Sequence, residues 1–95
     1  MKTKIIPKNQ HELVLFYLYN KQYFTLKDLI EDSMFFKFQT RLSDLEKIHG
    51  KLANRVRFSF VNRFGHHGSY FVYSAIDKSK ILSIYNKMNR IENHN

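Results

Sequence analysis

The spacing of the apolar residues changes at Gly50, and no other feature of the sequence constrains the fold as much. Before Gly50 the apolar residues have the i, i+4, i+7 spacing of an amphipathic helix, as in Phe38, Leu42 and Leu45. After Gly50 the segment RVRFSF, residues 55–60, alternates between polar and apolar side chains. That period of two predicts a strand with one apolar and one basic face.

The first third of the chain predicts two helices. Apolar side chains crowd over residues 10–20, with Asn20 as a candidate C-cap. Thr25, followed three positions later by Asp28, predicts a capping box at the start of a short second helix that ends near Ser33.

Two further helices are expected on either side of the strands. The third spans residues 34–49, and Gly50 stands where a left-handed residue commonly ends a helix. The last begins after Asp77 and runs over residues 78–91. Its apolar stripe consists of Ile81, Ile84, Tyr85, Met88 and Ile91.

The segment after the first strand predicts a β-hairpin. Residues 62–68 form its loop, in which Gly65 and Gly68 permit the reversal, and residues 69–76 form its return strand. The expected fold class is therefore α+β, with three helices, a two-stranded hairpin and a C-terminal helix. Its expected parts are a flexible arm over residues 1–7, a domain over residues 8–76, and a C-terminal amphipathic helix with a short tail over residues 77–95.

The chain is strongly basic, with a net charge of +8 over 95 residues. The excess lies in the middle, because residues 34–76 hold seven Lys or Arg and two acids, whereas residues 1–33 hold five Lys and four acids. A basic domain of this size most often binds nucleic acid. The absence of Cys excludes a disulfide framework and a thiolate zinc site. With no long apolar run and no signal-peptide pattern, we expect a cytoplasmic protein with no membrane partner.

The segment QTRLSDLEKIHGKL, residues 39–52, resembles the third-helix signature of small phage and prophage winged helix-turn-helix proteins. The matching residues are Thr40, Arg41, Leu42, Ser43, Leu45 and Gly50. The hairpin is similar to the wing of that family at Asn62, Arg63, Gly65, Tyr70 and Tyr73. The resemblance covers residues 10–76 and implies a DNA-binding protein of a mobile element, acting in a bacterial host cell, with its third helix in the major groove. The turn EDSMFF, residues 31–36, departs from the family, which often has a small residue and a Gly-Ile or Gly-Val turn there.

The candidate DNA contacts lie on the third helix and the wing. The polar face of the helix offers Lys37, Gln39, Thr40, Arg41, Ser43 and Lys47. In the major groove Arg reads guanine and Gln reads adenine, whereas Lys, Ser and Thr suit phosphate oxygens. The wing, residues 55–73, offers Arg55 and Arg57 on its outer face and, at its tip, Arg63, His66 and His67. We expect it to touch the backbone or the adjacent minor groove. The competing interpretation is that both surfaces are merely solvated.

The adjacent pair His66 and His67 makes a poor metal site. Neighbouring residues on a turn point apart, and a zinc site needs three or four ligands with supporting spacing. No Asp or Glu lies within the wing to orient a catalytic imidazole. We therefore expect polar tip residues that donate to phosphate, more strongly when protonated. We expect no enzyme activity, no metal, no cofactor and no small-molecule substrate.

Two alternatives to duplex DNA binding stay open. A winged helix also occurs as a protein-interaction module, here through Phe36, Phe64 and the last helix. RNA binding through the basic strand face is the second, but the hairpin has no aromatic RNA-recognition motif, and single-strand recognition usually stacks bases on exposed rings. The last helix either forms a homodimer or packs on the first helix of its own chain, through Ile81, Tyr85 and Met88. A transcriptional regulator, an excisionase-like factor and a replication accessory protein all fit the DNA-binding hypothesis.

Overall fold

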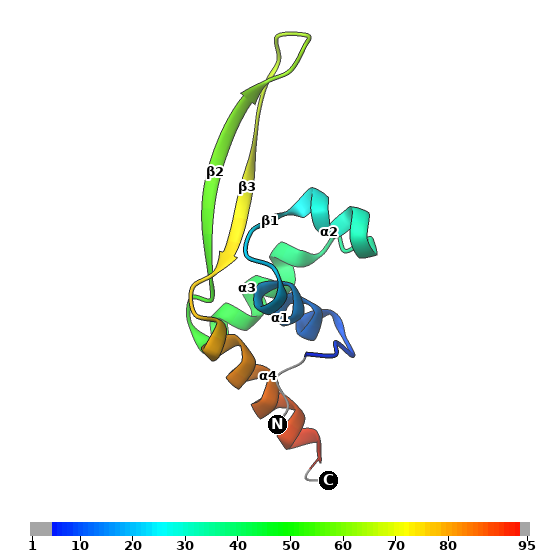
Figure 1. The fold of residues 1–95 in the computed structure, drawn as a ribbon, viewed down its shortest axis with the longest axis vertical. Helices are drawn as coiled ribbons and strands as arrows, with labels where there is room; N and C mark the ends of the chain where they lie inside the picture. Colours follow the sequence, from blue (N-terminus) through cyan, green and yellow to red (C-terminus); the bar gives the residue numbers. More distant parts are fainter. Residues whose placement is uncertain (1–4, 94–95) are drawn as a thin grey trace.

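In the described part of the chain, four helices form a base from which two long strands extend as a ribbon (Figure 1). The computed structural model describes the backbone of residues 5–93 and the side chains of residues 5–89. The helices are α1 (Gln10–Asn20), α2 (Leu26–Ser33), α3 (Phe38–His49) and α4 (Lys78–Asn93). The strands are β1 (Phe24–Thr25), β2 (Ala53–Val61) and β3 (His67–Ala75). The long dimension of 56 Å, against 24 and 23 Å for the other two, reflects how far the β2–β3 ribbon reaches.

The three strands form one antiparallel sheet in the order β1-β3-β2. The expectations of an α+β fold and of a β-hairpin are therefore correct, but the sheet has three strands instead of the expected two, because β1 adds a third. Phe24 pairs with Tyr73, and Thr25 pairs with Val72. The sequence did not predict β1 because two residues are too few to show an alternation.

Side-chain caps define where α1 and α2 begin. Asn9 Oδ1 accepts the N–H of Glu12 at 2.9 Å, so α1 starts where the sequence predicts. Thr25 and Asp28 form the predicted capping box, in which each side chain accepts the other residue's backbone N–H. At the end of α1 the Lys78 ammonium donates to carbonyls that a helix leaves free, those of Leu18, Tyr19 and Lys21.

The turn between α2 and α3 determines which of the neighbouring Phe35, Phe36 and Phe38 side chains are buried. Met34 adopts the left-handed conformation (φ 57°, ψ 34°), and its N–H donates to the Ile30 carbonyl at 2.8 Å. After this reversal Phe35 is buried, whereas Phe36 lies outside the helices and is 59% exposed. The expected helix start at residue 34 is wrong, since the chain has to reverse before α3 begins at Phe38.

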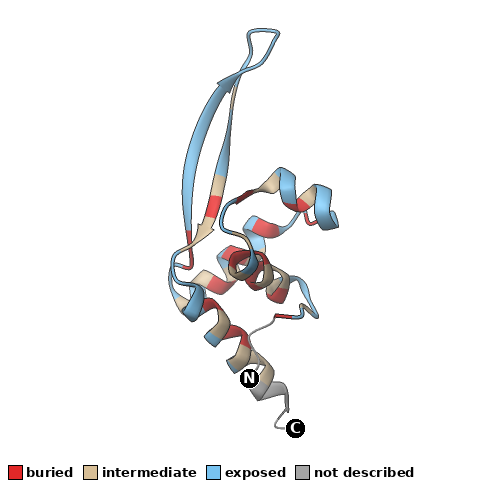
Figure 2. Cartoon of the chain, in the orientation of Figure 1, coloured by how far each residue is buried: buried red, intermediate tan, exposed pale blue. Residues whose placement is uncertain are grey.

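The core lies between the helices and the base of the sheet (Figure 2). Its centre is an aromatic cluster made of Tyr17, Phe24, Phe35, Phe38 and Tyr73. Packed ring pairs of this kind stabilise a core by more than their buried area alone. Phe38, Leu42 and Leu45 are all buried, which confirms the predicted apolar stripe of α3.

Helix α4 packs on α1 of its own chain. Ile81 and Tyr85 are buried, and Met88 is partly buried against the same core. Packing within the chain is therefore the arrangement that the fold adopts. Ile81 and Tyr85 are not free to form the dimer interface considered from the sequence.

The arm expected over residues 1–7 is anchored where the structure describes it. Ile5 is buried in the core, and the Tyr85 hydroxyl donates to the Ile6 carbonyl at 3.2 Å. Residues 1–4 lie outside the described residues.

The ribbon pairs in unbroken register, from Ala53 opposite Ala75 to Val61 opposite His67. Both strands begin two residues earlier than predicted, and the loop is correspondingly shorter. Most of the ribbon extends beyond the helices and is exposed on both faces (Figure 2). The chemistry of the two faces therefore decides what the ribbon can bind.

Candidate nucleic-acid interface

The register shows which face of the ribbon meets the helices. Cross-strand partners lie on the same face of a sheet. Tyr73 is buried against the helices, and its face carries Arg55 opposite it and Arg57 opposite Phe71. The other face carries Val56, Phe58, Phe60, Tyr70 and Val72. We call these the Tyr73 face and the Tyr70 face. The basic face is thus continuous with the helical side, and the expectation that it points outward is wrong.

Arg55 forms an ion pair with α3. Its Nη2 donates to Glu46 Oε1 at 2.9 Å, and its guanidinium lies 6.0 Å from the centre of the Tyr73 ring. Glu46 Oε2 also accepts the N–H groups of Leu52 and Ala53, at 2.8 and 3.3 Å. Burial acts to raise the pKa of Glu46, but the hydrogen bonds from Arg55 and the two backbone groups outweigh it, so this pKa lies below its ordinary value. Arg55 therefore fastens the ribbon to α3 and is not free for a phosphate.

Arg57 lies farther out on the Tyr73 face. Within the described residues its guanidinium makes no hydrogen bond or ion pair. With Ser59, His67 and Ser69 it lines a shallow polar recess of about 280 Å³. Ser59 and Ser69 are cross-strand partners, and their small side chains leave the recess open. A guanidinium, two hydroxyls and an imidazole are all groups that donate to phosphate oxygens.

Two of the expected base-reading side chains form hydrogen bonds within the chain. Gln39 Nε2 donates to the Tyr73 hydroxyl at 2.6 Å, on the side of α3 that faces the ribbon. Arg41 Nε donates to Gln10 Oε1 at 2.8 Å, and its Nη1 lies 3.5 Å from an Asp44 oxygen, on the side that faces α1. Gln39 and Arg41 therefore mark the two margins of the exposed side of α3.

The exposed side of α3 lies between those margins. Residues of an α-helix step by about 100° around its axis, so residues 40, 43 and 47 share the side opposite the buried stripe. The exposed side chains are Thr40, Ser43 and Lys47, with Lys37 just ahead of the first turn. Within the part of the chain that the structure describes, none of these four side chains has a hydrogen-bond or ion-pair partner. They are the predicted contacts that the fold leaves free.

Asp44 links α3 to α1. Its Oδ2 lies 3.0 Å from His11 Nε2 and 3.5 Å from Arg41 Nη1. The hydrogen bond with His11 lowers the pKa of Asp44 from its ordinary value, and Arg41 adds to the effect. This carboxylate is therefore held against α1 rather than presented to a phosphate.

The tip of the ribbon is closed by Asn62. Its Oδ1 accepts the N–H groups of Phe64 and His66 at 2.9 and 3.0 Å, and Gly65 takes a positive φ of 80°. The Arg63 guanidinium lies 4.8 Å from the centre of the Phe64 ring, which is 70% exposed. The two neighbouring histidines are exposed as well. The tip thus presents an arginine, two imidazoles and a ring to solvent.

The sequence did not predict the exposed Tyr70 face. Phe58, Phe60 and Tyr70 are each almost half exposed, although a strand with one apolar face normally turns that face to the core. A Cβ on Gly68 would come within 2.5 Å of the Phe60 ring, so Gly68 makes room for that ring. The expectation that Gly68 permits the reversal is wrong, because only Gly65 has a positive φ in the loop.

Among the described residues, no three His, Asp or Glu side chains gather in a way that could hold a metal ion. No helix in the same part of the chain is long and apolar enough to cross a membrane. No family model matches the chain, and no curated protein or solved structure was found to be similar to it.

Proposed function

We propose that the chain binds double-stranded DNA as a winged helix-turn-helix protein, with α3 in the major groove and the Tyr73 face against the phosphate backbone. One observation carries this proposal, namely that the two surfaces adjoin. Gln39 of α3 contacts Tyr73, and from Tyr73 the same face of the ribbon runs outward to Arg57. A duplex that lies along α3 therefore meets Arg57 on the same side of the molecule.

The order of the elements supports the proposal. Three helices precede a hairpin, and residues 34–37 form a tight turn between α2 and α3. This is the order in which a winged helix-turn-helix domain presents its third helix to the major groove. β1 lies beside the base of the ribbon and leaves the exposed side of α3 open.

The charge distribution supports it as well. Residues 47–76 hold five Lys or Arg and no Asp or Glu. Such a surface attracts a polyanion, and binding is driven by the counterions that the phosphates release.

The side chains without a partner among the described residues fall into two groups, those placed to contact bases and those placed to contact phosphates. Thr40 and Ser43 lie in the middle of the exposed side of α3, where the base edges pass. Lys37 and Lys47 lie toward its two ends and reach phosphates, as does Arg57 on the ribbon. The role that fits is that of a regulator or accessory DNA-binding factor of the phage or mobile-element kind that the sequence resembles.

The test is a titration of a fluorescent random-sequence duplex at several salt concentrations. We expect log K to fall linearly with log salt, with a slope of about −0.9 for each phosphate neutralised. Reversing two charges, Lys47→Glu with Arg57→Glu, lowers the affinity by about tenfold or more and makes the slope shallower by about 2. Lys87→Glu, which reverses one exposed charge on α4, is the control and keeps the wild-type slope.

Two outcomes would overturn the proposal. One is the absence of duplex binding at about 50 mM salt, where electrostatic binding is strong. The other is a doubly reversed protein that folds and still binds duplex like the wild type. Either result favours the protein-interaction alternative, for which exposed Phe36 and Phe64 are the first residues to probe.

A further inference from the structure

The Tyr70 face carries a row of exposed rings. Tyr70 lies between Phe58 and Phe60, with ring centroids 5.7 and 6.1 Å away. The Phe58 and Tyr70 rings are inclined by only 19°, so both present flat surfaces along the same ribbon. The three side chains are 46% to 47% exposed, and the helices do not cover them.

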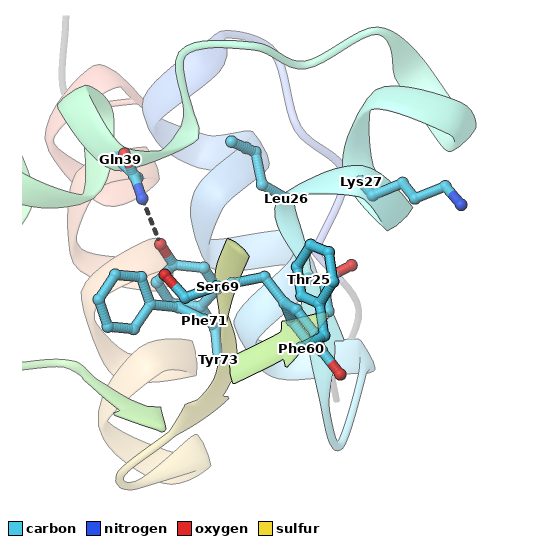
Figure 3. A pocket seen from close by; sticks show the side chains of 9 residues that line it. Thr25, Leu26, Lys27, Gln39, Phe60, Ser69, Phe71 and Tyr73 are labelled. Carbon is cyan, nitrogen blue, oxygen red and sulfur yellow. Dashed lines mark hydrogen bonds between the residues drawn. The ribbon is translucent and has the colours of Figure 1, made fainter. Parts of the chain in front are cut away.

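A groove continues from this row to the start of α2 (Figure 3). Its volume is about 600 Å³, and Phe60, Tyr70 and Phe71 line one side of it. Leu26 and Lys27 of α2 line the other side, and the Lys27 side chain extends outward from that rim. The Lys27 ammonium is highly exposed and lies 3.9 Å from Glu31, a distance at which an exposed pair holds it only weakly.

The groove also exposes backbone groups of β3. In an antiparallel ladder, alternate residues turn their N–H and C=O toward the same neighbour. Asn62 N–H donates to the His66 carbonyl at 2.9 Å. Because the register is unbroken, every second residue of β3 counted from His66 turns its N–H and C=O toward β2. Ser69 and Phe71 therefore turn their N–H and C=O away from β2. On that side Leu26, which follows β1, lies opposite Phe71, and the described residues provide no strand opposite Ser69.

Charge indicates what kind of molecule fits here. The ribbon belongs to the segment 47–76, which holds five Lys or Arg and no acid, so two ribbons repel each other. A suitable partner is anionic, has flat apolar groups for the rings, and has hydrogen-bonding edges for the open backbone. Unpaired nucleotides have all three properties, whereas a duplex hides the faces of its bases.

We propose that the Tyr70 face and the adjoining groove bind single-stranded nucleic acid, with bases stacked on Tyr70, Phe58 and Phe60. The open N–H and C=O groups of Ser69 meet base edges in the groove. Phosphates pass the rim of the groove, where the exposed Lys27 ammonium is within reach.

The rings lie on the face of the ribbon opposite Arg57. Gln39 and Tyr73, at the margin of the surface proposed for duplex DNA, also line the groove, so the two surfaces adjoin there. Binding of a single strand goes beyond the proposed function.

The test compares three labelled probes of about 12 units, within the size range of single-strand sites. They are oligo-dT, a chain of abasic sites with the same phosphates, and a duplex, each followed by fluorescence anisotropy. We expect oligo-dT to bind about tenfold tighter than the abasic chain, because only oligo-dT can stack. Tyr70→Ala and Phe58→Ala each weaken oligo-dT binding about fivefold or more, while abasic and duplex binding change by less than about twofold.

The controls separate this site from the fold and from the duplex surface. Ile48→Ala removes an even more exposed apolar side chain, on α3, and keeps the preference for oligo-dT. If Tyr70→Ala unfolds, as judged by circular dichroism, Tyr70→Leu keeps the apolar bulk and still lacks the ring. Arg57→Glu weakens duplex binding but leaves the ratio of oligo-dT to abasic affinity unchanged, so a failure of either proposal can be recognised separately.

Three results would overturn the inference. The first is equal affinity for oligo-dT and the abasic chain, which means that charge alone holds the strand. The second is an equal loss of duplex and oligo-dT binding when a ring is removed. The third is a dimer in analytical ultracentrifugation that Tyr70→Ala dissociates, because the face is then occupied by a second copy of the chain.

Discussion

Arg55 Nη2 lies 2.9 Å from Glu46 Oε1, so the first arginine of the ribbon binds the last turns of α3. The same carboxylate accepts the backbone N–H groups of Leu52 and Ala53, at the point where β2 begins. One side chain thus joins the end of α3 to the root of the ribbon. The two proposed DNA-contacting elements are held in fixed relation by Glu46.

Removing this carboxylate is expected to destabilise the fold. Glu46→Ala leaves two backbone N–H groups and one guanidinium without their acceptor, at a cost of about 2 kcal/mol in the free energy of unfolding. Urea denaturation measures the change. The control Glu31→Ala removes an exposed carboxylate from its pair with Lys27 and costs less than about 0.5 kcal/mol. Equal losses in the two variants contradict the joining role of Glu46.

Stability is also expected to depend on the ionisation of Glu46. Its pKa is lower in the folded protein than in the unfolded chain, because its hydrogen bonds outweigh the effect of burial. The contribution is fully present above the ordinary glutamate pKa of about 4.3 and is lost as the pH falls through the lower folded value. Denaturation curves recorded from neutral pH down to acid should therefore fall less steeply below about pH 4.3 for Glu46→Gln than for the wild type. A parallel fall in both proteins would show that other carboxylates account for the acid sensitivity.

The sequence predicts the fold well where a side chain caps the backbone nearby. Thr25 and Asp28 form their capping box within four positions, so neighbouring residues suffice to predict it. The turn at Met34 is different, because a left-handed conformation in a residue other than glycine is imposed by tertiary packing. Here the burial of Phe35 and Phe38 on either side of exposed Phe36 imposes it, and no local pattern in the sequence indicates that burial.

The sequence predicts which side chains of the ribbon share a face, but not how that face is oriented relative to the helices. Alternation establishes that Arg57 and Phe58 point to opposite faces, yet it does not say which face meets the helices. Tyr73 decides this through its place in the core. The exposed rings follow from lengths that only the structure gives, because the 9 residues of β2 span roughly 30 Å and the 12 of α3 only roughly 18 Å. The excess length necessarily leaves an apolar face uncovered.

The two arginines of β2 are expected to behave differently. Arg57→Ala weakens duplex binding and makes the salt slope shallower by about 1, because one phosphate contact is lost. Arg55→Ala lowers the free energy of unfolding by about 1 kcal/mol, because its hydrogen bond to Glu46 is lost, and leaves the salt slope unchanged. Binding titrations and denaturation of both variants check the contrast. If Arg55→Ala alone changed the slope, the assignment of the two side chains would be reversed.

Gly50 is expected to resist replacement even by asparagine. Its φ of 83° is positive as predicted, but its ψ of −176° lies outside the left-handed helical region and in one that essentially only glycine adopts. Gly50→Ala therefore lowers the free energy of unfolding by about 1 to 3 kcal/mol. Gly50→Asn costs about as much, although asparagine is tolerated at ordinary left-handed helix ends. Thermal denaturation of both variants tests this, and a nearly neutral Gly50→Asn would mean that the residue is in the ordinary left-handed conformation.

At Met34, in contrast, replacement by glycine is expected to stabilise the fold. Its φ of 57° and ψ of 34° cost a residue with a Cβ about 1 to 2 kcal/mol. Glycine removes that strain but loses more backbone entropy on folding, which offsets part of the gain. Because the Met34 side chain is 67% exposed, little packing is lost, and Met34→Gly should raise the free energy of unfolding by about 0.5 to 1 kcal/mol. Met34→Ala keeps the strain and serves as the control, with a change below about 0.5 kcal/mol. A destabilised Met34→Gly would mean that the methionine side chain contributes packing at this turn that outweighs the strain of its backbone.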